Sequence, residues 1–217
     1  MNRRQLVLWV ATAGAATGCS VAPKTPLAAV YDLGPPPPAW SAMAADHARA
    51  DAGAGRTSAA SVALGPRRAL LRVFDIIAPT WLNGTGMAYR LDHVDRYRRE
   101  IYRDSRWAAP PAAMLSLRVR QRLAAVPPAD GPANPEPRTL QISLDEFTQI
   151  FTSDSDSKAI VQIRARLGEP GAARLAVERP FSAERPAPSA DAQGGVRALA
   201  LATDALVEQI VAWATAG

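Results

Sequence analysis

The chain has 217 residues, enough for one folded domain together with short terminal segments. Hydrophobic residues make up 48% of it and charged residues 21%, which are ordinary globular values and exclude a largely disordered protein. The net charge is +5, carried almost wholly by arginine, and a single cysteine excludes an intramolecular disulfide.

The N-terminus has the three parts of a bacterial export signal. Arg3 and Arg4 precede an apolar run over 6–11, and small residues fill 13–18. The apolar run is too short for a membrane-spanning helix, which needs roughly 20 residues. We therefore predict a signal peptide over residues 1–18, and we expect no nucleic-acid partner because an exported protein rarely meets one.

The signal ends at the only cysteine of the chain. Ala16-Thr17-Gly18-Cys19 resembles the lipobox of bacterial lipoproteins, in which the cysteine thiol receives a diacylglyceryl group before cleavage. A lone cysteine in an exported protein fits this reading, since lipid would consume its thiol. The alternative is an ordinary secreted protein in which Cys19 is incidental. Because Ser20 rather than Asp follows the cysteine, the lipobox reading favours the periplasmic face of the outer membrane.

The N-terminal third of the mature chain contains few regular elements. We predict a tether over 19–28 and a domain over 29–216 that begins with a short strand at 29–33. Four prolines at 35–38 interrupt the chain. The stretch 40–66 is rich in Ala, Gly and Ser, and we expect a flexible insertion there with at most a weak helix over 42–50.

Alternating patterns then predict most of the sheet. A central strand is expected over 71–76, followed by a turn near Trp81 and strands over 87–91 and 100–107, with Ile101 and Trp107 on one face of the last. Further strands are expected over 140–151 with a bulge, 159–167 and 174–181. The pair 140–151 and 159–167 forms a hairpin.

Two amphipathic helices complete the pattern. One follows Pro110 and Pro111 and buries a stripe from Leu115 to Val126, with Arg118 and Arg120 directed away from it. The other runs from 196 to 214, with Asp204 and Glu208 on its polar side. Because both helices are apolar on one side only, the predicted fold is α+β: an antiparallel sheet with two helices packed on one face. Leu117 and Leu201 lie outside the apolar stripes, where they can contact a second subunit.

Catalytic and metal-binding motifs are not evident. The sequence contains no Gly-x-Ser-x-Gly motif and no glycine-rich phosphate loop. Its two histidines, His47 and His93, are far apart, and Asp154 and Asp156 lack the glycine and terminal glutamate of a calcium loop. We therefore expect no enzyme activity, no cofactor and no metal.

A docking surface is the alternative to a catalytic site. The stretch 92–106 carries five arginines among four acidic residues, which indicates either a solvated strand face or a docking surface. Trp81, Arg106 and Trp107 are the candidate residues, either at an interface or as a structural motif. For the two tryptophans, core packing is the simpler interpretation.

Several short segments together resemble a known family, the ABC-type transport auxiliary lipoproteins, including the PqiC-type subunits. The resemblance covers Ala29 to Ala216 and is carried by the following segments: Val30-Tyr31-Asp32-Leu33, the stretch Phe74 to Leu82, Ala88-Tyr89-Arg90-Leu91, Ser105-Arg106-Trp107-Ala108-Ala109-Pro110 with the helix after it, and the closing alanine-rich helix. The Arg-Trp pair before the helix is its most specific part.

The resemblance implies a non-enzymatic subunit anchored in the outer membrane by lipid. It would work with a periplasmic MCE-type (MlaD-like) protein and an inner-membrane ABC permease and ATPase, in lipid transport or envelope integrity. Two other hypotheses remain open. One is a lipid-binding module with an apolar pocket of several hundred Å³ between sheet and helices. The other is a structural envelope lipoprotein without a transporter.

Overall fold

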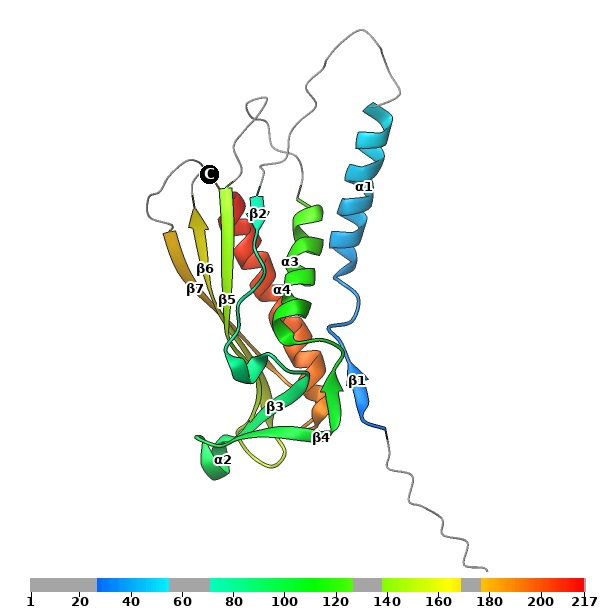
Figure 1. Cartoon of the computed structure of the whole chain (residues 1–217). Coiled ribbons are helices and arrows are strands. Elements are labelled where there is room, and N and C mark those ends of the chain that lie inside the picture. Colours follow the sequence, from blue (N-terminus) through cyan, green and yellow to red (C-terminus); the bar gives the residue numbers. More distant parts are fainter. Residues whose placement is uncertain (1–26, 55–70, 127–137, 169–176, 217) are drawn as a thin grey trace, which may run out of the picture.

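The computed structural model describes residues 27–54, 71–126, 138–168 and 177–216, and Cys19 lies outside them. Figure 1 shows the arrangement of the elements. The strands are β1 (Ala29–Tyr31), β2 (Leu71–Val73), β3 (Gly86–Leu91), β4 (Arg99–Trp107), β5 (Arg138–Phe151), β6 (Ser157–Gly168) and β7 (Val177–Pro186). The helices are α1 (Pro38–Ala54), α2 (Asp92–Asp95), α3 (Pro111–Ala124) and α4 (Ala192–Thr215), and a 3₁₀ turn, η1, covers Thr80–Leu82.

The fold is α+β, as predicted, but the seven-stranded sheet is mixed rather than wholly antiparallel. Its order is β1-β4-β3-β5-β6-β7, and β2 pairs with the first residues of β5 whereas β3 pairs with its last residues. The pairs β3–β4, β5–β6 and β6–β7 are antiparallel, whereas β1–β4, β2–β5 and β3–β5 are parallel. Each antiparallel pair is consecutive in the chain. Each parallel pair is separated by at least one helix, as a parallel connection requires a long crossover.

The core lies between one face of the sheet and the helices. Residues of α3 and α4 that face the sheet are fully buried: Leu115, Val119, Leu206, Val207 and Ile210. The predicted helical stripes are confirmed by this burial. By length and composition α4 is also the one helix among the described residues that could cross a membrane, but half of the relevant window is buried inside the fold. It is the central helix of the core.

Capping explains where α4 begins. The helix starts four residues before the predicted position 196, because Asp191 acts as its N-cap and its carboxylate accepts the N–H of Gly194 at 2.6 Å. This hydrogen bond, with a second from the Ser189 hydroxyl, holds the pKa of Asp191 below its usual value. A buried amide fastens the same end to the sheet, since Gln149 Nε2 donates to the Asp191 carbonyl at 3.1 Å.

The N-terminal part is more ordered than the composition suggested. A helix, α1, covers Pro38–Ala54, where we expected a flexible insertion over 40–66 with at most a weak helix. Residues 55–70 lie outside the described residues. Trp40 is only 4% exposed, so an aromatic anchor compensates for the low hydrophobicity of the alanine-rich segment.

Two strand predictions require correction. The stretch 71–76 does not form a central strand: β2 has three residues and pairs with β5 alone, and Phe74 and Ile77 beyond it are exposed. In β4, Trp107 does not share the face of Ile101. The β3–β4 register shifts between Gly86, opposite Arg106, and Ala88, opposite Ile101, so the bulge reverses the alternation. Trp107 therefore enters the core while Ile101 stays half exposed.

Candidate functional site

The described residues contain no group of three or more His, Cys, Asp or Glu side chains that could hold a metal ion. Two clusters of arginine and carboxylate dominate the polar interactions instead. One lies on the face of the sheet away from the helices, and we call it the outer-face cluster: Trp81, Arg90, Arg99, Glu146 and Thr148. The other joins α3 to α4, and we call it the inter-helix ladder: Arg118, Arg122, Asp204 and Glu208.

A β-bulge in β5 creates the outer-face cluster. Leu144 faces the helices, so uninterrupted alternation would also direct Glu146 into the core. The register of β5 with β6 shifts between these two residues, which leaves Asp145 as the extra residue. Glu146 therefore faces outward, opposite the polar Gln162. The bulge over this stretch was predicted from the sequence, and its consequence for Glu146 was not.

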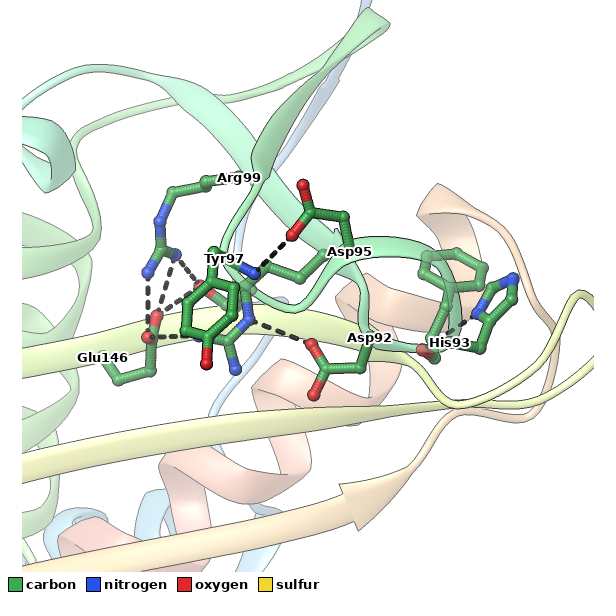
Figure 2. Close-up of polar contacts among 9 residues, drawn as sticks. Asp92, His93, Asp95, Tyr97, Arg99 and Glu146 are labelled. Carbon is green, nitrogen blue, oxygen red and sulfur yellow. Dashed lines mark hydrogen bonds and ion pairs between the residues drawn. The ribbon is translucent and has the colours of Figure 1, made fainter.

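Glu146 lies between two arginines that are opposite each other in the β3–β4 pair, Arg90 and Arg99. Arg99 donates from Nη1 and Nη2 to the two carboxylate oxygens at 3.0 and 2.9 Å, and Arg90 lies 3.7 Å away (Figure 2). The Thr148 hydroxyl donates to the same carboxylate. Like charges directly opposite each other in a sheet repel, and the Glu146 carboxylate between the two arginines offsets this repulsion.

The environment of Glu146 fixes its charge. Burial alone would raise the pKa of this carboxyl, but hydrogen bonds from Arg99 and Thr148, together with the Arg99 charge, lower it below its ordinary value. Trp81 covers the other side of Arg99, with the guanidinium carbon 3.7 Å from the ring centroid. Trp81 itself remains 42% exposed. The cluster thus presents to solvent an aromatic ring that stacks on an arginine held by a carboxylate.

The short helix α2 adjoins this cluster, is joined to it by one ion pair, and makes further contacts with the β5–β6 hairpin. Asp92 forms an ion pair with Arg90 at 3.3 Å, and Asp95 accepts the Tyr97 N–H at 2.9 Å (Figure 2). His93 contacts the Phe151 carbonyl at 3.3 Å and Asp154 at 3.0 Å. These contacts fix the β3–β4 connection against the β5–β6 hairpin. Their role is structural.

The inter-helix ladder has two rungs with the same spacing on both helices. Arg118 and Arg122 are four residues apart on α3, as are Asp204 and Glu208 on α4. Arg118 Nε lies 3.1 Å from Asp204, and Arg122 Nε donates to Glu208 at 2.7 Å. The side chains we expected in solvent on both helices therefore face one another. Burial raises the pKa of Asp204, Arg118 opposes this, and the charge of Glu208 adds to it.

Each rung also holds the N-terminal segment. Arg118 Nη2 donates to the carbonyls of Leu33 and Gly34 at 2.5 and 3.1 Å, just after β1. Gly34 has φ +67°, a left-handed conformation that glycine adopts without strain. At the second rung, Trp40 Nε1 of α1 donates to Glu208. The ladder therefore connects β1 and α1 to the two core helices.

The sequence-predicted site residues do not form one site. Trp81 belongs to the outer-face cluster, Trp107 is buried at 2% exposure against Phe147, and Arg106 is exposed at the end of β4. Core packing is thus the observed environment of Trp107 alone. The sequence analysis missed Arg118, which is 2% exposed. The signal for it was the matched spacing of arginines on one helix and carboxylates on the other.

Comparisons with known proteins identify the family. The family model of the ABC-type transport auxiliary lipoprotein component matches residues 53–211, so the chain belongs to this family. It is a family of transport auxiliary components, not of enzymes, and its lipoprotein character implies a location in the cell envelope. No curated protein matches the chain.

Two solved structures share the fold. A crystal structure of protein XCC0632 from Xanthomonas campestris, assigned to a domain family of unknown function (DUF330), aligns with a TM-score of 0.59 and 20% identity over 70% of this chain and 87% of that one. A crystal structure described only as an uncharacterized protein aligns with a TM-score of 0.52 and 20% identity over 68% and 92%. At this level of identity the likeness extends to the fold alone.

Proposed function

We propose that this protein is a periplasmic adaptor, fixed by a lipid on Cys19 to the inner face of the outer membrane. It docks an MCE-type periplasmic protein, and through it an inner-membrane ABC permease and ATPase, for lipid transport. Membership in the auxiliary lipoprotein family supports the transport role. The Ser20 that follows Cys19 supports the outer rather than the inner membrane.

The observation that carries the proposal is how the fold holds the chain that follows the anchor. β1 begins ten residues after Cys19 and is fixed by its pairing with β4 and by Arg118 hydrogen bonds just beyond it. A pull on the tether therefore acts on a strand of the main sheet and on a buried arginine, rather than on a frayed terminus. Such an attachment suits a domain that must hold a large partner at a membrane.

The open position of the cavities among the described residues favours an adaptor over a lipid carrier. The side chains at the central positions between sheet and helices are 0% exposed: Leu115, Leu144, Leu206 and Ile210. Cavities of about 560, 390 and 470 Å³ that are lined by described residues open on the outside of the fold: beside α3, beside β1, and on the outer face of the sheet. A carrier would enclose its ligand between apolar walls.

Metabolic labelling with palmitate tests the anchor. The native protein should take up label and fractionate with the outer membrane, whereas Cys19→Ala should take up none and appear in the soluble fraction. An unlabelled native protein would exclude lipid anchoring. Mass spectrometry of the mature N-terminus provides an independent measurement of the acyl groups.

Affinity capture tests the partner. The lipidated protein should retain a co-expressed MCE-type protein, and Trp81→Ala should weaken retention because the Trp81 ring is the exposed part of the outer-face cluster. Leu117→Ala is the matched control, since Leu117 is a large apolar residue 58% exposed on α3. Equal retention of both variants would exclude Trp81 from the interface. No retention of any form would favour a structural envelope lipoprotein.

A further inference from the structure

Exposed apolar side chains gather at the end of the fold where the described chain begins. Leu27 is 97% exposed, Val30 in β1 is 53% exposed and Ile101 in β4 is 51% exposed. β4 and the first residues of β1 lie together at the lower end of the molecule, opposite the C-terminal ends of α1 and α3 (Figure 1).

Strand register makes Val30 and Ile101 neighbours through Arg106 and Gly86. Val30 pairs with Arg106 across the β1–β4 ladder, and Gly86 pairs with Arg106 on the other side of β4. A Cβ atom on Gly86 would lie 3.1 Å from Ile101 Cγ2, so the isoleucine covers the glycine. Because paired residues project to the same side of a sheet, Val30, Arg106 and Ile101 form one surface on the side away from Trp107.

The charge on this surface is available for a ligand. Within the described residues no hydrogen bond or ion pair is made by the exposed Arg106 side chain, whereas Arg98 pairs with Glu100 and Arg103 with Asp104. A guanidinium presents paired donors that match phosphate oxygens, and aliphatic side chains beside it can enter the boundary between headgroups and acyl chains. We call Val30, Ile101 and Arg106 the anchor-proximal patch, and Leu27 precedes it in the chain.

The length of chain before Leu27 determines what this patch meets. Eight peptide steps separate Cys19 from Leu27, and they span at most about 29 Å even when fully extended. A linker of this length gives an effective concentration in the millimolar range. Contacts too weak to bind a membrane from solution are therefore sufficient for a domain that is already tethered to it.

We propose that the anchor-proximal patch is a second membrane contact, which lies on the phospholipid surface with Val30 and Ile101 in the interface and Arg106 on a lipid phosphate. This inference rests on the proposed lipidation of Cys19. The contact orients the domain, because it places β4 against the bilayer and directs the opposite end, with the C-terminal ends of α1 and α3, into the periplasm.

Solvent accessibility in proteoliposomes tests the contact. Lipidation consumes the native thiol, so Ile101→Cys gives the full-length lipoprotein one reactive cysteine for an environment-sensitive fluorophore. In vesicles of phosphatidylethanolamine and phosphatidylglycerol, we expect quenching by aqueous iodide to fall several-fold relative to detergent. Leu117→Cys on α3, where the native side chain is 58% exposed against 51% for Ile101, is the matched control and should be quenched alike in both media.

A second variant tests the arginine. Adding Arg106→Glu to the labelled Ile101→Cys protein should restore quenching in vesicles, while Arg120→Glu, the same charge change on α3, should leave it low. Intact mass reports the acyl groups in every sample. An acylated protein whose probe at 101 is quenched as strongly in vesicles as in detergent overturns the membrane contact and leaves the anchor intact. A protein without acyl groups overturns both the anchor and the contact.

Discussion

The inter-helix ladder and the outer-face cluster use the same residue types in different surroundings. In the ladder, the Arg118 side chain is 2% exposed and that of its ion-pair partner Asp204 19%. Arg118 also donates to backbone carbonyls of a distant segment. In the outer-face cluster, the Arg99 side chain is 26% exposed and Glu146 14%, and Trp81 above them reaches solvent. The first network joins three parts of the fold internally. The second stiffens a surface.

Because of this difference, the pKa values of Asp204 and Glu146 are shifted in opposite directions. Burial dominates at Asp204 and raises its pKa, whereas bidentate bonding by Arg99, with the Thr148 hydroxyl, prevails over burial at Glu146 and lowers it. A half-buried carboxylate is thus well satisfied on the outer face and poorly satisfied between the helices. We infer that the ladder is kept for the position of β1 and α1 more than for its own electrostatic stability.

Removal of the buried arginine has the largest expected effect. Arg118→Ala leaves Asp204 without its cation and two carbonyls without their donor, so the free energy of unfolding should fall by about 3–5 kcal/mol. Urea titration of the purified domain measures it. Arg120→Ala is the matched control on the same helix, because its partner Asp75 is 96% exposed and such pairs contribute at most about 1 kcal/mol. Equal losses in both variants would show that Arg118 is not an organising residue.

Loss of the Glu146 charge in the outer-face cluster has the second-largest expected effect on stability. Glu146→Gln keeps the shape but leaves Arg90 and Arg99 opposite each other without a counter-charge, so we expect a loss of about 1–3 kcal/mol. Asp145→Asn is the control in the adjacent residue, since its ion pair with Arg164 lies in solvent and should contribute less than about 1 kcal/mol. A larger loss in Asp145→Asn would reverse the assigned importance of the two residues.

The elements of the fold differ in how well the sequence predicts them. The β5–β6 hairpin, the bulge and both apolar helix stripes were predicted from short-range patterns, and the structure confirms them. The export signal was predicted in the same way and stays a prediction, because it lies outside the described residues. The parallel pairs could not be predicted in this way, because they depend on which strands the helical crossovers bring together. The same limit explains β2, whose β-branched pattern resembles a central strand but has a neighbour on one side only.

The polar clusters were harder to predict from the sequence than the strand pairing. Arg118 lies on the side of α3 away from the Leu115 stripe, where periodicity places a residue in solvent. Its burial results from α4 and the segment after β1, which both pack against that side. Both are distant in sequence, and Leu33, for example, lies 85 residues before Arg118. Trp81 was found because it is a conspicuous residue type, but its partner Arg99 was indistinguishable from the other arginines of the stretch 92–106.

The pH dependence of stability sharpens the contrast between the two carboxyl groups. For Glu146 the folded-state pKa lies below the ordinary value of 4.5, so its contribution is present above that pH and is lost as the pH falls. For Asp204 the folded-state pKa lies above 3.8, so the folded state binds more protons and stability decreases as the pH rises from 3.8 through the raised value.

Urea titration across the acidic range measures both effects. Glu146→Gln should reduce the loss of stability on acidification relative to the native protein. Asp204→Asn should change the slope in the opposite sense and make stability rise more steeply with pH. If both variants alter the slope in the same direction, the two carboxyl groups do not occupy the contrasting environments inferred for them.

The smallest expected effect is at the exposed ring of the outer-face cluster. Trp81→Ala removes the stacking on Arg99 but leaves the Arg99–Glu146 bonds in place, so we expect a loss of about 0.5–1 kcal/mol in the free energy of unfolding. Tyr97→Ala, at a side chain 92% exposed, should cost still less. A loss above about 3 kcal/mol at Trp81 would be the cost of emptying a core site. A small loss means instead that the ring does little for the fold, and that any large effect of Trp81→Ala on partner retention arises at the interface itself.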